Sequence, residues 1–307
     1  DMSSEQQKKS FRSGFIAVVG RPNVGKSTLI NSLMGQKLLI MSDKPQTTRN
    51  QLLCILTNDS SQMLFLDTPG IHKPKHKLGE YMVAQAEKTL RDVDLSLFVV
   101  DATEERGPGE NFILEYLAKS NVPVILVINK VDLLSGPEAV LSVINRYAHT
   151  VPFVAVVPVS ALEKTNLGKL TELIEAQLPE GPLLYPADMV TDQPERFIAA
   201  EIIREKLLHV MRDEVPHALA VEIDEMKTRE NEDVYIRANV YVERESQKGI
   251  VIGAGGQVLK DVGRLARQEI ETMVGNRVYL ELWVKVRKDW RNKSGSLRSF
   301  GYGNEKE

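Results

Sequence analysis

Gly20-Arg21-Pro22-Asn23-Val24-Gly25-Lys26-Ser27 is the stretch of this sequence that decides the fold. It follows the apolar run Phe15–Val19 and opens Ser27–Leu33, where apolar residues recur at helical spacing. Glycines allow the backbone N–H groups of such a loop to curl around phosphate oxygens, and the helix that follows adds the positive end of its dipole. The order strand, glycine-bounded loop, helix predicts a phosphate-binding loop, in which Lys26 reaches the β and γ phosphates and the Ser27 hydroxyl ligates Mg²⁺.

Length, charge and cysteine content limit the class of protein. The chain has 307 residues, a net charge of −3 and a single cysteine, which suggests two domains in which any basic surface must be local. Cys54 lies in an apolar run, so we expect a buried strand residue, with no disulfide or cysteine metal site within the chain. The polar extension 1–13 shows no signal segment, and no run of about 18 apolar residues predicts a membrane span. We therefore expect a cytoplasmic protein.

Strand-like apolar runs alternate with helical patterns from Phe15 to about Leu178. Continuous apolar strands linked by helices predict a mostly parallel sheet with both faces covered, whose ligands bind at the carboxyl ends of the strands. The expected strands are 15–19, 51–56, 63–66, 95–100, 122–128 and 153–159, and the expected helices are 27–33, 79–91, 109–119, 136–148 and 168–178.

Two polar stretches downstream of the glycine loop fit Mg²⁺ and phosphate. Asp43–Arg49 is expected to be a mobile connection in which a threonine supplies a second hydroxyl to Mg²⁺ when a γ-phosphate is present. Asp67-Thr68-Pro69-Gly70 ends a strand, so Asp67 can hold Mg²⁺ through water and Gly70 can turn its N–H toward the γ-phosphate. Taken alone, both stretches are also ordinary polar turns.

The next polar motif, Asn129-Lys130-Val131-Asp132, ends another predicted strand. A carboxylate there accepts hydrogen bonds from the N1–H and 2-amino groups of guanine, which adenine cannot offer, so the site rejects adenine. Asn129 is expected to tie loops together, and the Lys130 stem to cover one face of the base. Ser160-Ala161-Leu162 would offer a backbone N–H to guanine O6.

These five stretches occur in one order, and the segment resembles the translation-factor-related GTPases, in the branch that contains TrmE, Era and EngA. The resemblance implies binding and hydrolysis of GTP with Mg²⁺, and it makes Thr48 rather than Thr47 the metal-binding threonine. The predicted catalytic residues are Lys26, Thr48 and Gly70, and the predicted metal ligands are Ser27, Thr48 and, through water, Asp67. The predicted nucleotide-binding residues are Asn23, Val24, Gly25, Lys26, Ser27, Thr28, Asp67, Gly70, Asn129, Lys130, Asp132, Ser160, Ala161 and Leu162.

Two residues bear on the rate of hydrolysis. Ile71 follows Gly70 where Ras-like GTPases carry a glutamine that positions water, and an aliphatic side chain makes no such hydrogen bond. We therefore expect slow intrinsic hydrolysis of GTP to GDP and phosphate. Asn23 resembles the asparagine with which several GTPases of this branch hold an activating K⁺.

Repeated prolines and glycine mark 179–193 as a linker after a GTPase domain at 14–178. The pattern beyond it predicts a helix over 196–211, strands near 219–223 and 234–242, a helix near 247–252, a glycine turn, a helix to about 273 and a strand over 278–286. This order predicts a smaller α+β domain over 194–290, followed by a basic tail over 291–307.

Gly253-Ala254-Gly255-Gly256 decides the second half, because a G-x-x-G turn lets the backbone approach a sugar-phosphate chain. With Ile250-Val251-Ile252 before it, the domain resembles a type II KH domain, which clamps single-stranded RNA. Residues 248–298 carry eleven Lys or Arg against five Asp or Glu, the footprint expected of phosphate contact. The predicted RNA-binding residues are Lys248, Ile252, Gly253, Ala254, Gly255, Gly256, Lys260, Arg264, Trp290 and Arg291.

A GTPase domain, a proline-broken linker and a KH-like domain together resemble the Era family of ribosome-assembly GTPases across nearly the whole chain. The resemblance implies binding to the 3′ end of 16S ribosomal RNA in small-subunit assembly, and peripheral association with the inner face of the cell membrane. The residues by themselves support GTP-controlled binding of single-stranded RNA. A GTP-dependent switch that docks a protein partner through its C-terminal domain stays open, as does an ATP-using enzyme.

Overall fold

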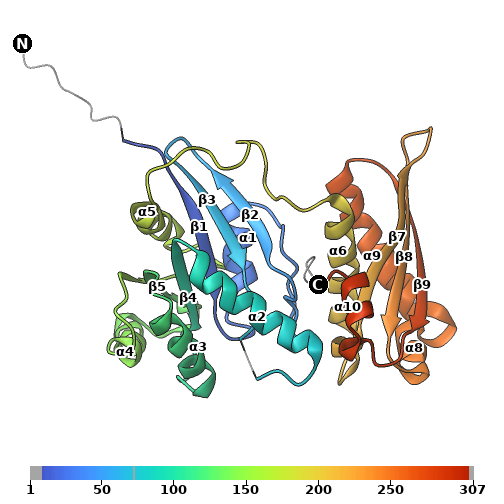
Figure 1. The fold of residues 1–307 in the computed structure, drawn as a ribbon, viewed down its shortest axis with the longest axis horizontal. Helices are drawn as coiled ribbons and strands as arrows, with labels where there is room; N and C mark the ends of the chain where they lie inside the picture. The colour runs from blue at the N-terminus through green and yellow to red at the C-terminus, as the bar shows by residue number, and fades with distance from the viewer. Residues whose placement is uncertain (1–8, 72, 304–307) are drawn as a thin grey trace, which may run out of the picture. The chain divides into compact units, whose positions relative to one another are not determined.

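The computed structural model describes residues 9–71 and 73–303, and the chain forms two compact units that do not follow the order of the sequence (Figure 1). Within the described residues, the first unit contains 9–39, 51–71 and 86–192, and the second contains 40–50, 73–85 and 193–303. Two segments of the expected GTPase domain therefore belong to the second unit. Residues 1–8 of the expected N-terminal extension and the last four residues of the expected tail lie outside the described residues.

The first unit contains one six-stranded sheet with strand order β2-β3-β1-β4-β5-β6. All neighbouring strands are parallel except β2 and β3. The strands are β1 (Arg12–Val19), β2 (Leu52–Thr57), β3 (Ser61–Asp67), β4 (Leu95–Asp101), β5 (Val124–Asn129) and β6 (Ala155–Pro158). The helices of this part of the chain are α1 (Lys26–Met34), α2 (Lys77–Asp92), α3 (Pro108–Lys119), α4 (Pro137–Tyr147) and α5 (Leu167–Gln177), with a 3₁₀ turn η1 (Val131–Leu133). The mostly parallel sheet expected from continuous apolar strands is confirmed.

Helices cover both faces of this sheet, as the apolar strands require. Figure 1 shows α1 on the opposite side of the sheet from α2 and α3. On the α2–α4 side one core contains side chains of β1, β4 and β5 together with Ala86 and Leu90 of α2, Ile113, Leu114 and Leu117 of α3, and Val143 and Tyr147 of α4. Cys54 is buried in β2 as expected, and burial raises the pKa of its thiol.

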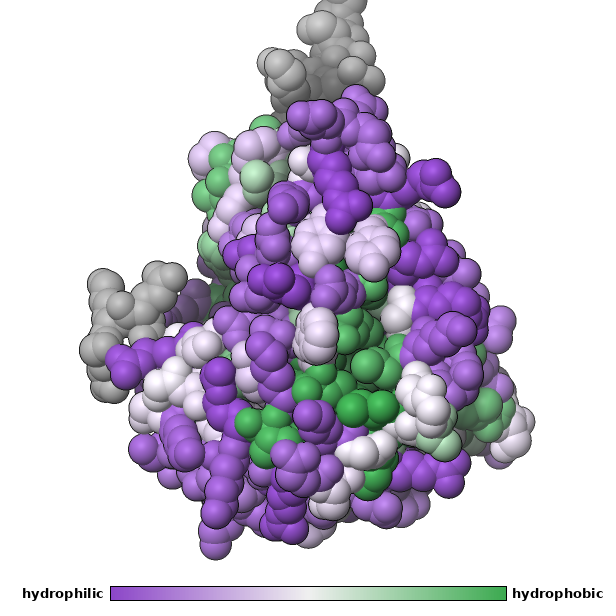
Figure 2. All heavy atoms as spheres, turned by 90° about the vertical axis from the view of Figure 1, so that its right-hand side faces the viewer, coloured by the Kyte–Doolittle hydropathy of each residue, from purple (hydrophilic) through white to green (hydrophobic). Residues whose placement is uncertain are grey.

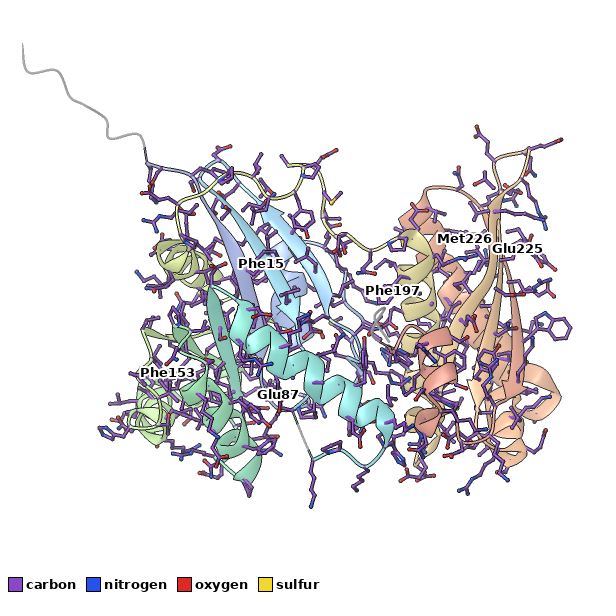
Figure 3. All side chains as sticks on the ribbon, in the orientation of Figure 1. Phe15, Glu87, Phe153, Phe197, Glu225 and Met226 are labelled. Atoms are coloured by element: carbon purple, nitrogen blue, oxygen red, sulfur yellow. The ribbon has the colours of Figure 1, made fainter. Side chains whose placement is uncertain are left out.

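The second unit packs helices against a three-stranded sheet of order β7-β8-β9. Strand β7 is antiparallel to β8, and β9 is parallel to β8. Its strands are β7 (Ala220–Thr228), β8 (Val234–Val242) and β9 (Val278–Val286), and its helices are α6 (Glu195–Val210), α7 (Val215–Ala218), α8 (Glu245–Ile252), α9 (Gln257–Val274) and α10 (Ser294–Ser299), with 3₁₀ turns η2 (Ala254–Gly256) and η3 (Trp290–Asn292). Met226 of β7 packs against the core, whereas its neighbour Glu225 pairs with Lys227 at 2.8 Å (Figure 3).

The segment 40–50, which contains the expected mobile connection Asp43–Arg49, belongs to the second unit. Ile40 joins its core, and the Met41 N–H donates to Glu205 Oε2 at 2.7 Å. Arg49 is 2% exposed, donates to the carbonyls of Leu219 and Pro216, and lies 5.7 Å from the ring centre of Trp290. Within 43–49 only Arg49 is buried, and its partners lie more than 150 residues away in sequence, so the expected mobility of this stretch stays a prediction.

Candidate nucleotide site and nucleic-acid interface

The glycine loop joins β1 to α1 at the carboxyl edge of the parallel sheet, where ligands bind in this architecture. Gly25 has φ of 97°, and a Cβ at this position would collide with the side-chain amide of Asn129. A Cβ on Gly20 would likewise collide with the carbonyl of Val99. Only glycine therefore fits at both ends of the loop, and glycines allow the backbone to curl around an anion.

Lys26, the predicted phosphate ligand, lies inside this loop. Its Nζ donates to the carbonyls of Gly20 at 2.7 Å and of Arg21 at 3.0 Å. Burial lowers the pKa of Lys26 to about 8, although the nearby carboxylate of Asp67 opposes this shift. The ammonium is thus held at the loop by weak neutral acceptors, and a phosphate that replaces them offers full charge pairing.

Ser27 and Asp67 come together from α1 and the end of β3. The Ser27 hydroxyl donates to Asp67 Oδ2 at 3.3 Å. A hydroxyl and a carboxylate are the oxygen donors that suit Mg²⁺, so this pair fits the predicted metal position. Thr68 fixes the strand end, because its backbone N–H and its hydroxyl both donate to the carbonyl of Val18. A Cβ on Gly70 would meet no atom within 4 Å.

Asn129, Lys130 and Ala161 link the guanine loops to the glycine loop. Asn129 Nδ2 donates to the carbonyl of Val24 at 2.8 Å, and its Oδ1 accepts from the N–H of Ala161 at 3.0 Å. Lys130 Nζ donates to the carbonyl of Asn23 at 2.7 Å. Asp132 is exposed in η1, and Leu162 is 74% exposed beside buried Ser160 and Ala161. The carboxylate of Asp132 is thus accessible to a base at this edge.

Two predicted determinants of hydrolysis do not belong to this cluster. Thr48 falls in the second unit, with the segment 40–50, so its part in metal binding stays a prediction. Ile71 is 9% exposed and packs in the core with residues of β1, β4 and β5. The position where Ras-like proteins carry their glutamine is therefore occupied here by a core side chain.

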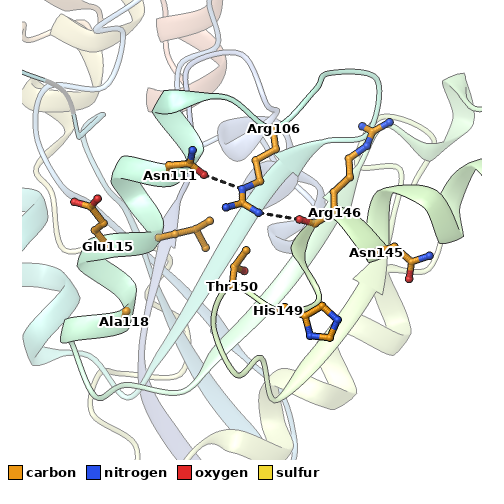
Figure 4. A pocket seen from close by; sticks show the side chains of 9 residues that line it. Arg106, Asn111, Glu115, Ala118, Asn145, Arg146, His149 and Thr150 are labelled. Atoms are coloured by element: carbon orange, nitrogen blue, oxygen red, sulfur yellow. Dashed lines mark hydrogen bonds between the residues drawn. The ribbon is translucent and has the colours of Figure 1, made fainter.

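A surface pocket of about 570 Å³ lies between α3 and the end of α4, apart from all predicted nucleotide ligands (Figure 4). The guanidinium of Arg106 crosses it, donating to Asn111 Oδ1 at 2.8 Å and to the carbonyl of Arg146 at 3.0 Å. These two bonds hold α3 to α4, which gives this arginine a structural role in the pocket.

The predicted RNA turn joins α8 to α9 in the second unit. Gly253, Gly255 and Gly256 have φ values of 76°, 62° and 74°, in the left-handed region that favours glycine. A Cβ on Gly253 would collide with the side chain of Val258, whereas nothing lies within 4 Å of one on Gly255 or Gly256. The turn thus presents bare backbone at the N-terminus of an 18-residue helix, where anions are favoured.

Basic and apolar side chains border the turn. Lys260 and Arg264 are exposed one helical turn apart on α9, whose Val262, Ala266 and Ile270 are buried. Ile250 of α8 is 53% exposed and Leu265 of α9 is 40% exposed. Figure 2 looks onto the face of this unit that carries β9 and α8, and shows an apolar area surrounded by hydrophilic side chains. Cations beside apolar surface suit phosphates and unpaired bases together.

Trp290 and the tail require a correction. Trp290 was predicted to contact RNA, but it is fully buried, and its Nε1 donates to the carbonyl of Ala218 at 2.7 Å. Arg291, also predicted to contact RNA, forms an ion pair with Glu243 at 3.0 Å, and its contact with RNA stays a prediction. The residues that follow form α10 and bury Leu297, Phe300 and Tyr302 around Trp290. The exposed tryptophan is Trp283, at 53%.

Sequence reasoning missed one residue of the nucleotide edge. Asp101 ends β4 and places its carboxylate 2.8 Å from Lys130 Nζ. The signal was present, because a carboxylate at a strand end had identified Asp67. The predicted strand stopped one residue short, at Val100, so Asp101 was not predicted to be a strand-end carboxylate.

Comparison with known proteins gives the relatives of this chain. Residues 15–130 match the family of 50S ribosome-binding GTPases, and residues 214–291 match the KH domain family. GTPase Era of Heliobacterium modesticaldum is 56% identical over 299 residues, covering 97% of this chain and 100% of that protein. GTPase Era of Alkaliphilus metalliredigens is 53% identical over 294 residues, covering 95% of this chain and 99% of that protein.

A solved structure extends the likeness to the fold. The crystal structure of Era in complex with MgGDPNP and nucleotides 1506–1542 of 16S ribosomal RNA matches with a TM-score of 0.92 and 44% identity, covering 96% of this chain and 100% of that one. The predicted fold class, a P-loop GTPase domain followed by a type II KH domain, is confirmed in its two parts.

Proposed function

Because the chain belongs to the Era family of GTPases, we propose that it binds the 3′ end of 16S ribosomal RNA in a GTP-controlled manner during small-subunit assembly. Its GTPase activity follows from the family. The observation that carries the proposal is the glycine turn between α8 and α9, which presents open backbone beside Lys260 and Arg264. The likeness to an Era bound to a 16S RNA segment supports it.

For hydrolysis, Lys26 would exchange its loop carbonyls for the β and γ phosphates, and Gly70 would donate its N–H to the γ-phosphate. Ser27, Thr48 and, through water, Asp67 would hold Mg²⁺, which when bound neutralises the charge that develops between the β and γ phosphates. No side chain at position 71 orients the attacking water, because Ile71 is in the core. Slow intrinsic turnover is the expected consequence.

The nucleotide-controlled switch is tested by binding an RNA oligonucleotide of the 16S 3′ end to the GDPNP-bound and GDP-bound protein. Coupling requires that the two affinities differ, and that RNA changes the affinity for GDPNP relative to GDP by the same factor. Equal affinities in the two states would reject the switch.

Competition between GTP and ATP for the same site tests whether the site is specific for guanine. Equal competition would reject Asp132 as the residue that selects guanine.

The competing function, docking of a protein partner through the second unit, makes a different prediction for the glycine turn. Gly256→Asp should lower RNA affinity at least tenfold, because it places a carboxylate against the phosphates. Gly275→Asp is the matched control, since Gly275 also has positive φ, of 77°, in open space, but at the other end of α9. Equal RNA binding by both folded variants would favour the protein-docking alternative.

We also propose that K⁺ accelerates hydrolysis through Asn23. Its place in the glycine loop, with φ of 65°, supports the proposal. Replacement of K⁺ by Na⁺ should then slow GTP hydrolysis, and the Asn23→Ala protein should not distinguish the two ions. An unchanged rate in Na⁺ would reject the idea.

The proposed location of the protein is the cytoplasm, with peripheral attachment to the inner face of the cell membrane. Within the described residues, none of the helices combines the length and apolar character needed to cross a bilayer. The excess of Lys and Arg over 248–298 suits an anionic lipid surface. Sedimentation with vesicles that contain anionic lipid, but not with neutral ones, is the expected result, and no sedimentation with either would reject attachment.

A further inference from the structure

The ammonium group of Lys130 is held between two oxygens that belong to different loops. Its Nζ lies 2.8 Å from Asp101 Oδ2 at the end of β4, and donates at 2.7 Å to the carbonyl of Asn23 in the glycine loop. The Lys130 side chain is 32% exposed and that of Asp101 only 5%. A partly buried ion pair with an additional carbonyl acceptor fixes the amine far better than a surface pair would.

Asp101 is itself fixed in orientation. In the sheet register it lies beside Asn129, the residue before Lys130. Its second oxygen, Oδ1, accepts from the backbone N–H of Thr103 at 2.8 Å and from the Thr103 hydroxyl at 2.6 Å. Although burial opposes ionisation, the hydrogen bonds from Lys130 and Thr103 keep the pKa of the Asp101 carboxyl below its ordinary value. The carboxylate that contacts Lys130 is therefore charged, and its orientation is fixed by Thr103.

The two ends of the contact are backbone positions that need support. Lys130 has φ of 67° and Asn23 has φ of 65°, in the left-handed region that non-glycine residues rarely adopt. Such conformations persist where surrounding contacts over-determine them. The contact with Asp101 supplies this support for Lys130 in the guanine loop, and the hydrogen bond from Lys130 to the carbonyl of Asn23 joins that loop to the glycine loop.

We propose that Asp101 is a positioning residue for guanine-nucleotide binding, which holds Lys130 so that its aliphatic stem lies over one face of the base. The inference rests on the proposed assignment of Asn129–Asp132 to the guanine. Asp101 touches neither base nor phosphate in this account and acts only through the Lys130 ammonium. Its loss should therefore weaken binding of the base and leave recognition of the phosphates in place.

The test compares the affinities of the full-length protein for GDP and for pyrophosphate. Asp101→Asn should lower the affinity for GDP about tenfold, the range expected for one hydrogen bond between charged groups, and change that for pyrophosphate less than twofold. Lys130→Met removes the charge and keeps the stem. In the Lys130→Met background, Asp101→Asn should have an effect of less than twofold, because the group through which it acts is already gone.

Glu175→Gln is the matched control for general damage to the first unit. Glu175 of α5 is also a buried carboxylate that accepts from two hydroxyls, of Ser60 at 3.0 Å and Ser61 at 3.2 Å, and pairs with a lysine, Lys9, at 3.2 Å. Ser61 begins β3, whereas the nucleotide edge lies at its other end, at Asp67. Glu175→Gln should therefore leave the affinity for GDP unchanged even if it lowers the thermal stability of the ligand-free protein.

Three results would overturn the inference, given that the unaltered protein binds GDP. These are an unchanged affinity for GDP in Asp101→Asn, an equal loss for GDP and pyrophosphate, or full additivity with Lys130→Met. If Asp101→Asn does not fold, Thr103→Val tests the same contacts by removing one bond that orients Asp101, and a wild-type affinity for GDP there would overturn it. Failure of the unaltered protein to bind GDP would instead reject the proposed function.

Discussion

At the scale of the residue, the pKa of Lys26 depends on the groups that surround its ammonium. In the ligand-free protein burial lowers its pKa to about 8, from an ordinary value of 10.5. Between these two values the folded protein has lost a proton that the unfolded chain retains, so this residue makes the ligand-free fold more stable as the pH rises from 8 to 10.5. A phosphate bound beside Lys26 favours the charged ammonium, and therefore raises the pKa that burial had lowered.

The affinity for GDP should therefore fall as the pH rises above 8, by up to about tenfold per pH unit. Binding in this range must return a proton to Lys26. Calorimetric titration of GDP in two buffers of different ionisation enthalpy, at about pH 8.5, should show uptake of most of one proton. At pH 7 the proton uptake by Lys26 on binding GDP should be small. Binding without proton uptake at the higher pH would contradict the assignment of Lys26 to the phosphates.

At the scale of the element, the C-terminal segment shows how a short helix is stabilised by what it covers. Helix α10 has only six residues and would not persist alone in water. Phe300, at its end, is 8% exposed, and its ring centre lies 5.3 Å from that of Trp290 and 4.7 Å from that of Tyr241. These contacts make the segment part of the core of the second unit.

Phe300→Ala should lower the free energy of unfolding of the second unit by about 3 kcal/mol, the usual cost of removing a buried aromatic ring. Chemical denaturation monitored by the fluorescence of Trp290, in a Trp283→Phe background, would measure it. The matched control is Leu162→Ala in the first unit, since Leu162 is 74% exposed and should cost less than about 0.5 kcal/mol. An equally small effect at Phe300 would show that α10 merely lies on the surface.

The elements that could be predicted from the sequence are those whose signal is local. The glycine loop between β1 and α1, the alternating strands β8 and β9, and the glycine turn before α9 carry their own periodicity and turn residues. Helices α7 and α10 were missed, because four and six residues are too few for a periodic pattern. Trp290 was predicted to contact RNA because its structural partner is distant in sequence. The Ala218 carbonyl that accepts from its indole N–H is 72 residues away.

The candidate site divides in the same way. Asn129 and Lys130 were predicted from a motif, whereas Asp101 belongs to no motif. Its place at a strand end could be predicted, but its contact with Lys130 follows only from the pairing of β4 with β5. Sequence order places Asp101 and Lys130 far apart, whereas the parallel register makes Asp101 the neighbour of Asn129. Positioning residues of this kind depend on sheet topology, which periodicity does not specify.

At the scale of the whole molecule, the boundary between the units does not follow the chain. The segments 40–50 and 73–85 lie within the sequence of the GTPase part but pack in the second unit. Arg49 accounts for part of this, because its buried guanidinium needs the carbonyls and aromatic rings that the second unit supplies. Thr48, the predicted Mg²⁺ ligand, precedes Arg49 in the chain and belongs to the same unit.

Positive charge is distributed unevenly along the chain, which predicts how salt affects RNA binding. The chain has a net charge of −3, but the RNA turn is bordered by Lys248, Lys260 and Arg264. If these three cations each neutralise one phosphate of a single strand, the logarithm of RNA affinity should fall with the logarithm of salt concentration with a slope of about −2. Lys260→Gln should make the slope shallower by about 0.7 and weaken binding.

Lys169→Gln is the control, because Lys169 is an exposed lysine of α5 in the first unit, 58% accessible, with only a weak pairing to Glu172 at 3.8 Å. It should leave both the slope and the RNA affinity unchanged. Fluorescence anisotropy of a labelled 16S 3′-end oligonucleotide over a range of KCl concentrations would measure all three proteins. If Lys260→Gln and Lys169→Gln shifted the slope equally, the RNA would be responding to net charge, and the assignment of the phosphates to the cations beside the glycine turn would be rejected.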